Sequence, residues 1–239
     1  MSEAINRRRF LHSAGAAGGA VLAAPALAQA QGTVAPPEVK PMTYEIKPLP
    51  VDPKQVKGIS EKLLVSHYEN NYSGAVKRLN AITAQLAALD WASAPVFQIN
   101  GLKREELIAM NSMILHEIYF DGIGGGGDPK GGLAEAITRD FGSVARWRAE
   151  FAAIAKAQGG GSGWTVLAWS PRDKRLVNAW ASDHTTNVAG GRPVLVLDMY
   201  EHAYHMDYGA KAAGYVDAFM QVIRWDGPAK RFDQYSHET

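Results

Sequence analysis

A carboxylate and an imidazole stand close together after an apolar run near the C-terminus. Asp198 and His202 follow the run 193–197, with three residues between them. A strand that ends at Asp198 would present an oxygen ligand and a nitrogen ligand at one edge of a sheet, where ligands commonly bind. The same spacing is also common in proteins without a metal, so the pair needs support from other residues.

The remaining side chains limit how a metal could be held. The chain has no cysteine, which excludes thiolate ligands, disulfides and a cysteine nucleophile. Two histidines, His67 and His116, stand in stretches with helical apolar periodicity. A single histidine on such a face is more often a packed core residue than a ligand. Any metal would have to be held by histidine nitrogen and carboxylate oxygen.

The elements that would position these side chains are helices first and strands later. Helical periodicity runs from Ser60, a candidate N-cap, to Asn80, and again from Arg104 to Tyr119. Five glycines in the six residues 122–127 then break the second helix. Later helices are predicted at 131–139, 143–157 and around 215–224, and strands at 164–169, 175–180 and 193–197.

This order predicts an α+β fold. Residues 59–122 would form an N-terminal domain, a hairpin of long helices. Residues 128–239 would form a C-terminal α/β metal-binding domain with a small three-stranded antiparallel sheet and helices.

The N-terminal segment has the composition of an export signal. Three arginines at 7–9 precede a small apolar run at 14–27 and a small-residue cleavage site at 28–30. The paired arginines followed by Phe-Leu resemble a twin-arginine signal, and the run is shorter than the roughly 20 residues that span a bilayer. We therefore expect residues 1–30 to be removed after Ala28 or Ala30, a periplasmic location and no membrane association afterwards. Residues 31–58 would form a Pro-rich surface linker.

Charge argues against a nucleic-acid partner. The chain has a formal net charge of +1, and removal of residues 1–30 takes away one glutamate and three arginines, which leaves about −1. A near-neutral protein without a basic stripe has no general attraction to phosphate.

Several ordered motifs resemble those of one known family. The sequence D-M-Y-E-H-A-Y-H at 198–205 resembles the D-V-W-E-H-A-Y-Y signature of the iron/manganese superoxide dismutases. The resemblance extends from about residue 59 to about residue 235. Further matching blocks are Asp128-Pro129, Leu133 to Ile137, Phe141-Gly142-Ser143 and Gly161 to Trp164.

The resemblance implies a metal site and an activity. The family's ligands correspond to His67, His116, Asp198 and His202, which would hold one iron or manganese ion per subunit. The substrate would be superoxide, and the protein would be a homodimer or homotetramer. Neutral nitrogens with one anionic oxygen suit a metal that must both accept and return an electron.

The same resemblance assigns supporting roles. His184 would tune the solvent ligand of the metal, and Glu201 would reach the partner subunit's ligand histidine and orient it. If the resemblance is set aside, His184 is interpreted as an ordinary loop histidine and Glu201 as a solvated acid at the start of a helix. Trp164 and Tyr200 would lie in the surrounding shell, where Tyr200 replaces the family's tryptophan.

Several positions depart from the family pattern. Ala75 stands where the family has an active-site tyrosine, and Tyr72, one turn earlier, is a candidate to fill the vacancy. Asn71 replaces a gateway histidine and His205 the last tyrosine of the signature, so a contact between them could replace the family pair at the subunit interface. An arginine that attracts the anion is absent at Ala212, where the neighbouring Lys211 could supply part of the field.

Three functions remain open at this point. The first is a periplasmic superoxide dismutase with an altered gate. The second is a metal-binding member of the same fold whose redox activity has changed because Ala75 opens the metal to larger ligands. The third is a structural or metal-holding protein without activity, which the intact set of four ligands disfavours.

Overall fold

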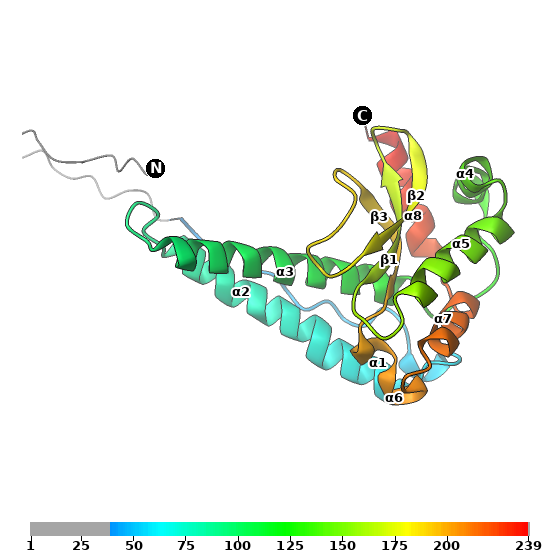
Figure 1. Ribbon diagram of the computed structural model, residues 1–239, viewed down its shortest axis with the longest axis horizontal. Coiled ribbons are helices and arrows are strands. Elements are labelled where there is room, and N and C mark those ends of the chain that lie inside the picture. The colour runs from blue at the N-terminus through cyan, green and yellow to red at the C-terminus, as the bar shows by residue number, and fades with distance from the viewer. Residues whose placement is uncertain (1–38, 239) are drawn as a thin grey trace, which may run out of the picture. The chain divides into compact units, whose positions relative to one another are not determined.

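Two long helices lie side by side in a computed structural model that describes residues 39–238 (Figure 1). They are α2 (Ser73–Ala87) and α3 (Val96–Asp121). Ahead of them, α1 (Glu61–Ser66) begins after Ser60, whose hydroxyl accepts a hydrogen bond from Leu63 N at 3.1 Å. The predicted helical hairpin is confirmed, although α3 begins directly after Pro95 and well before the predicted start at Arg104.

A π-helical segment, η2 (His67–Tyr72), joins α1 to α2. At its end the Ser73 N–H donates to Tyr68 O, five residues back. Such segments add a residue to one helical turn and are common at functional sites. Leu64 before it and Val76 after it are both buried, so the apolar faces on its two sides pack into the same core.

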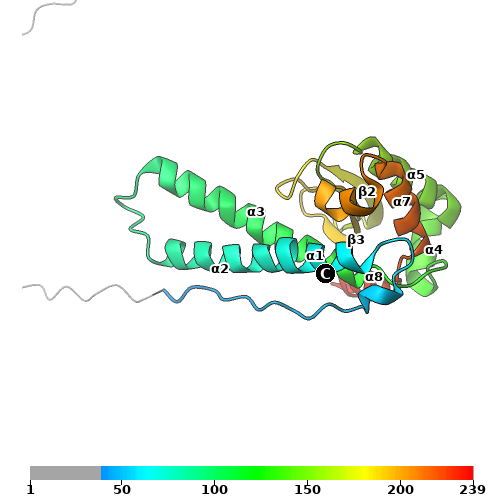
Figure 2. The same cartoon turned by 90° about the horizontal axis from the view of Figure 1, so that it is seen from below.

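The proline-rich segment ahead of α1 lies along the hairpin as a surface strap of residues 39–52 (Figure 2). Tyr44 N donates to Asn80 Oδ1 at 2.8 Å, and Lys47 N donates to the Tyr72 hydroxyl at 2.9 Å. One turn of 3₁₀ helix, η1 (Pro53–Gln55), follows. The expected export signal at 1–30 and the first part of the linker lie outside the described residues. Across residues 39–238, no helix is both long enough and apolar enough to cross a membrane.

Three antiparallel strands form the sheet, in the order β2-β1-β3. They are β1 (Trp164–Ser170), β2 (Arg175–Ala181) and β3 (Arg192–Asp198). The register places Trp164 opposite both Ala181 and Asp198, so the strand ends that carry the candidate site meet at one edge. Pro193, which has no N–H to donate, lies in the edge strand β3, beside a register shift at Leu167/Ala168. The predicted sheet is confirmed.

Helices complete the C-terminal part. Before the sheet lie α4 (Gly131–Phe141) and α5 (Val144–Ala157), which begins after Ser143, whose hydroxyl accepts from Arg146 N at 3.1 Å. After the sheet come η3 (Glu201–Ala203), α6 (His205–Tyr208), α7 (Ala212–Gln221) and α8 (Asp226–His237).

The predicted final helix around 215–224 is corrected in two respects. It ends at Gln221, because Ile223 pairs with Ile123 as an isolated bridge. A further helix, α8, then begins with Pro228 in its first turn, where a missing N–H costs nothing.

Candidate metal centre

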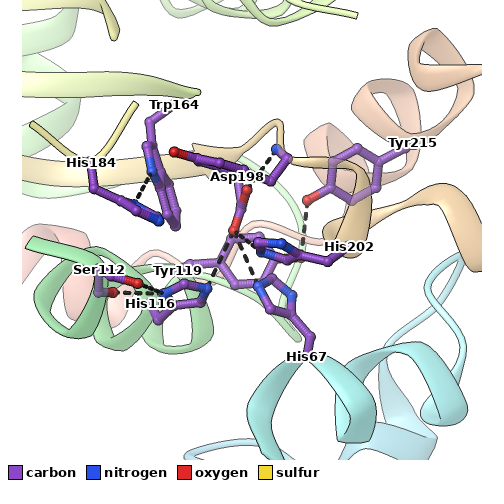
Figure 3. Close-up of polar contacts among 10 residues, drawn as sticks. His67, Ser112, His116, Tyr119, Trp164, His184, Asp198, His202 and Tyr215 are labelled. Atoms are coloured by element: carbon purple, nitrogen blue, oxygen red, sulfur yellow. Dashed lines mark hydrogen bonds and ion pairs between the residues drawn. The ribbon is translucent and has the colours of Figure 1, made fainter. Parts of the chain in front are cut away.

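Four side chains from four elements converge between the helical hairpin and the sheet (Figure 3). His67 is the first residue of η2, His116 lies towards the end of α3, Asp198 ends β3, and His202 lies in η3. The first three are buried and His202 is partly buried. One possible ligand atom from each lies within 4.8 Å of the others, so the structure brings the four predicted ligands together.

Asp198 Oδ2 is the common neighbour of the three imidazoles. It lies 3.1 Å from His67 Nε2, 3.2 Å from His202 Nε2 and 3.5 Å from His116 Nε2. Two ligand atoms that each lie about 2.1 Å from one ion are about 3.0 Å apart when the ligand–ion–ligand angle is a right angle. They are about 3.6 Å apart when that angle is about 120°. The spacing therefore fits one metal ion held by three nitrogens and one oxygen.

His116 is held in the tautomer that can bind a metal. Its Nδ1–H donates to Ser112 O at 2.6 Å, which leaves a lone pair on Nε2. Nε2 is buried and has no hydrogen-bond partner among the residues that the structure describes. A buried nitrogen without a partner is costly, and coordination would satisfy it.

A backbone hydrogen bond fixes the orientation of the Asp198 carboxylate. Its Oδ1 accepts a hydrogen bond from Tyr200 N at 2.8 Å, which leaves Oδ2 to face the histidines. Burial would raise the pKa of this carboxyl, but the charge of His202 and hydrogen bonds to His202 and His67 outweigh burial and hold the pKa well below its usual range.

The histidines respond to burial in the opposite sense. Burial lowers the pKa of His67, and it lowers the pKa of His116 to about 3. Neutral imidazoles around an ionised carboxylate give a buried site with free lone pairs and a negative charge. Such a site favours a cation.

A shell of aromatic residues excludes water behind the ligands. The rings of Tyr119 and Phe120 each lie 5.1 Å from the His67 ring. Tyr119 accepts a hydrogen bond from the Tyr215 hydroxyl at 3.1 Å, and burial raises the pKa of both phenols. These tyrosines therefore act as neutral packing groups.

His184 lies beside the cluster and is oriented by two side chains. Trp164 Nε1 donates to His184 Nδ1 at 2.9 Å, and Asn111 Nδ2 donates to His184 O at 2.6 Å. The Tyr200 ring stacks on His184 at 4.7 Å and on His202 at 5.3 Å. Because Nδ1 accepts the hydrogen bond from Trp164, a neutral His184 carries its proton on Nε2. Burial lowers the pKa of His184, and the nearby charge of Asp198 opposes this shift in part.

A cavity of ≈ 340 Å³ opens beside the ligands and gives access to them. It is lined by Asn71, Ala75 and Arg78 from η2 and α2, and also by three histidines, His116, His184 and His202. Because Ala75 contributes only a methyl group, no large side chain at this position separates the cavity from the ligand rings.

Tyr72 does not fill the space beside Ala75. Its hydroxyl accepts from Lys47 N at 2.9 Å and donates to Glu117 Oε1 at 3.1 Å, on the side of the hairpin that carries the strap. There it lines a different cavity, of ≈ 410 Å³. Burial raises its pKa to about 12. The suggestion that Tyr72 takes over the role of the family's tyrosine is therefore corrected.

Three other predicted residues lie at the surface of the described chain. Glu201 is the exposed first residue of η3, and His205 is exposed at the start of α6. Lys211 is exposed just before α7 and does not line the metal cavity.

Three residues of the site, Arg78, Asn111 and Ser112, are not predicted from the sequence. Arg78 could have been found, because it continues the face of Asn71 and Ala75 at a spacing of four and three residues. Ser112 precedes His116 by one helical turn, but its contribution comes from the backbone carbonyl, which carries no sequence signal.

Known proteins with similar sequences agree with this geometry. The model of the iron/manganese superoxide dismutase C-terminal domain matches residues 129–231. The chain is 70% identical to the iron superoxide dismutase of Cupriavidus metallidurans over 191 residues, which cover 80% of this chain and 97% of that protein. It is 35% identical to manganese superoxide dismutase 2 of Haloferax volcanii over 201 residues, which cover 81% of this chain and 97% of that protein. It is 34% identical to the iron superoxide dismutase of Aquifex pyrophilus over 190 residues, which cover 76% of this chain and 88% of that protein. Since such identities extend over nearly the full length of the first two relatives, the chain belongs to the iron/manganese superoxide dismutase family.

Proposed function

We propose that this chain is a superoxide dismutase, which converts two superoxide ions and two protons into one dioxygen and one hydrogen peroxide. One observation carries the proposal. His67, His116, Asp198 and His202 converge at the spacing of ligands to a single ion, in a chain closely similar to an iron superoxide dismutase. Iron or manganese held there, one ion per subunit, would take an electron from one superoxide ion and return one to the next.

The protein's own residues would hold the site, keep it dry and admit the substrate. His67 and His116 stay neutral and Asp198 stays ionised, so these three donors need no proton loss before they bind a cation. Tyr119 and Phe120 close the inner side, so the anion would enter through the cavity beside Ala75.

His184 is our candidate for positioning a proton at the centre. The hydrogen bond from Trp164 to Nδ1 leaves the proton on Nε2, and the ring forms part of the cavity wall. From there Nε2–H could donate to a solvent molecule or to the incoming substrate.

Two further properties belong to the proposal. Glu201 and His205 are exposed and Asn71 is partly buried. Their positions around the cluster would allow a homodimer or homotetramer in which Glu201 accepts from a ligand histidine of the partner subunit. The sequence of residues 1–30 supports export to the periplasm by the twin-arginine route.

A second candidate function follows from the cavity beside Ala75. Without a large side chain at this position, ligands bigger than superoxide could reach the metal, and the chain could act on another small oxidant or dismutate superoxide only weakly.

Superoxide decay, followed by stopped flow on protein loaded separately with iron and with manganese, would decide between them. Fast decay that depends on the metal would support the dismutase and name the metal. A full complement of metal without decay would support the second candidate.

The ligand assignment can be tested without turnover. His202→Ala should lose most of the bound metal, because one of the four donors is removed. His237→Ala, at the exposed end of α8, should keep it. Equal metal contents, measured by mass spectrometry of the purified proteins, would contradict the assignment.

A further inference from the structure

The cavity that leads to the metal ligands contains one cationic side chain, Arg78. We propose that Arg78 attracts the anionic substrate into this cavity and positions it there, a role that rests on the dismutase function proposed above. No other arginine or lysine lines the cavity in the described part of the chain. The remaining lining groups are small, amide, hydroxyl, apolar or imidazole side chains.

The helix α2 brings Arg78 to this wall. Asn71, Ala75 and Arg78 recur at a spacing of four and three residues, so they share one face and line the same cavity. Gly74 lines it too, and a Cβ atom built there would meet no atom within 4 Å. Gly74 and Ala75 therefore add little bulk to the part of the lining that they share with Arg78.

A local cation matters here because the protein as a whole is close to neutral. The full chain has 25 basic and 24 acidic side chains, so it has little overall attraction for an anion. Charges at the mouth of a cleft with low-dielectric walls focus the field and raise the rate of encounter with a small ion.

Arg78 is also available to an incoming anion. Its only ionic partner in the described chain is Glu105 on α3, and 55% of the Arg78 side chain and 31% of the Glu105 side chain remain exposed. Ion pairs of this exposure are weak, so an anion can compete with the carboxylate for the guanidinium. Glu105 itself would repel superoxide, so the pair sets the strength of attraction at the cavity mouth.

Arg78 would take the steering role that the sequence suggested for Lys211. Lys211 lies outside the cavity, on the segment between α6 and α7. If steering comes from the cavity wall, removal of the Arg78 charge has a larger effect than removal of any exposed charge elsewhere.

The test compares metal-loaded variants with equal metal content. Arg78→Gln should lower kcat/KM for superoxide by about three- to tenfold at low ionic strength, and Arg78→Lys should retain most of it. Glu105→Gln should raise kcat/KM by about twofold. Arg172→Gln, in the exposed turn between β1 and β2 at the far end of the sheet, removes the same charge and should match the wild type. At about 1 M salt, where the Debye length is about 3 Å, these differences should largely disappear.

A second measurement does not depend on turnover. Isothermal titration with azide should show about three- to tenfold weaker binding to metal-loaded Arg78→Gln than to wild type or Arg172→Gln. The inference is overturned if Arg78→Gln matches Arg172→Gln in both assays, or if Lys211→Gln produces the loss instead. A metal-loaded wild type without any superoxide decay would instead refute the proposed function, and the azide titration would still decide whether Arg78 attracts anions.

Discussion

Acid should destabilise the metal-free protein steeply, because two fully buried imidazoles stay neutral in the folded chain. Burial lowers the pKa of His67 and lowers that of His116 to about 3. In the unfolded chain both return to about 6.5. Below this pH the unfolded chain binds protons that the folded chain does not bind, so the free energy of unfolding falls as the pH falls. For His116 this continues until the folded chain also takes up the proton, near pH 3.

The size of the effect follows from proton linkage. Each proton bound only by the unfolded chain lowers the free energy of unfolding by about 1.4 kcal/mol per pH unit. An imidazole in the unfolded chain is about three-quarters protonated at about pH 6 and almost fully protonated at about pH 5. His116 alone should therefore remove about 1 kcal/mol of stability over this interval, and His67, whose pKa is also lowered, should add to the loss.

Urea titrations with a chelator present, at both pH values, would measure this loss. His116→Gln removes one of the two groups and should reduce the loss by about 1 kcal/mol. His237→Gln is the matched control, since its side chain is exposed before and after unfolding. If His116→Gln shows the same pH dependence as wild type and His237→Gln, the buried imidazoles are protonated in the folded chain and the reasoning is refuted.

Two substitutions test how the end of the sheet supports the site. Trp164→Phe removes the hydrogen bond to His184 and leaves a small cavity, so the free energy of unfolding measured in urea should fall by about 2–4 kcal/mol. Nitrogen NMR of the His184 ring should show loss of the single tautomer. Unchanged chemical shifts would contradict the role of Trp164 in fixing this tautomer. Gly163→Ala should also cost about 2–4 kcal/mol, because Gly163 has φ 136° and an added Cβ would overlap Ala181 O. Gly160→Ala, with φ 83° but open space around it, should cost only about 1 kcal/mol, and equal losses in the two glycine variants would show that contact with Ala181 is unimportant.

Periodicity in the sequence was enough to predict most of the fold. The strands were placed to within one residue at either end, since their two-residue alternation is bounded by glycine, proline or a charged turn. The start of α3 was missed because Val96 and Phe97 are exposed and break the apolar pattern. The last helix, α8, was missed because its composition is mostly polar and only Pro228 and Phe232 are buried.

The site was predicted in part. Resemblance to the family's motifs identified the four candidate ligands, which the structure then placed at one point. It could not identify Ser112, whose backbone oxygen fixes His116, or the direction of the Tyr72 hydroxyl. Such features depend on the rotation of one helix against another, which a one-dimensional pattern does not contain.

The length of the π-helical segment η2 sets the rotation of α2 relative to α1. An α-helix turns by about 100° per residue, so deletion of one residue within His67–Tyr72 would rotate α2 by roughly that angle relative to α1. His67 would keep its place, while Ala75 and Arg78 would turn away from the cavity and bulkier neighbours would take their positions. The length of this one segment therefore sets which side chains the substrate meets, so a single insertion or deletion there could change the entrance of the site and leave every ligand unchanged.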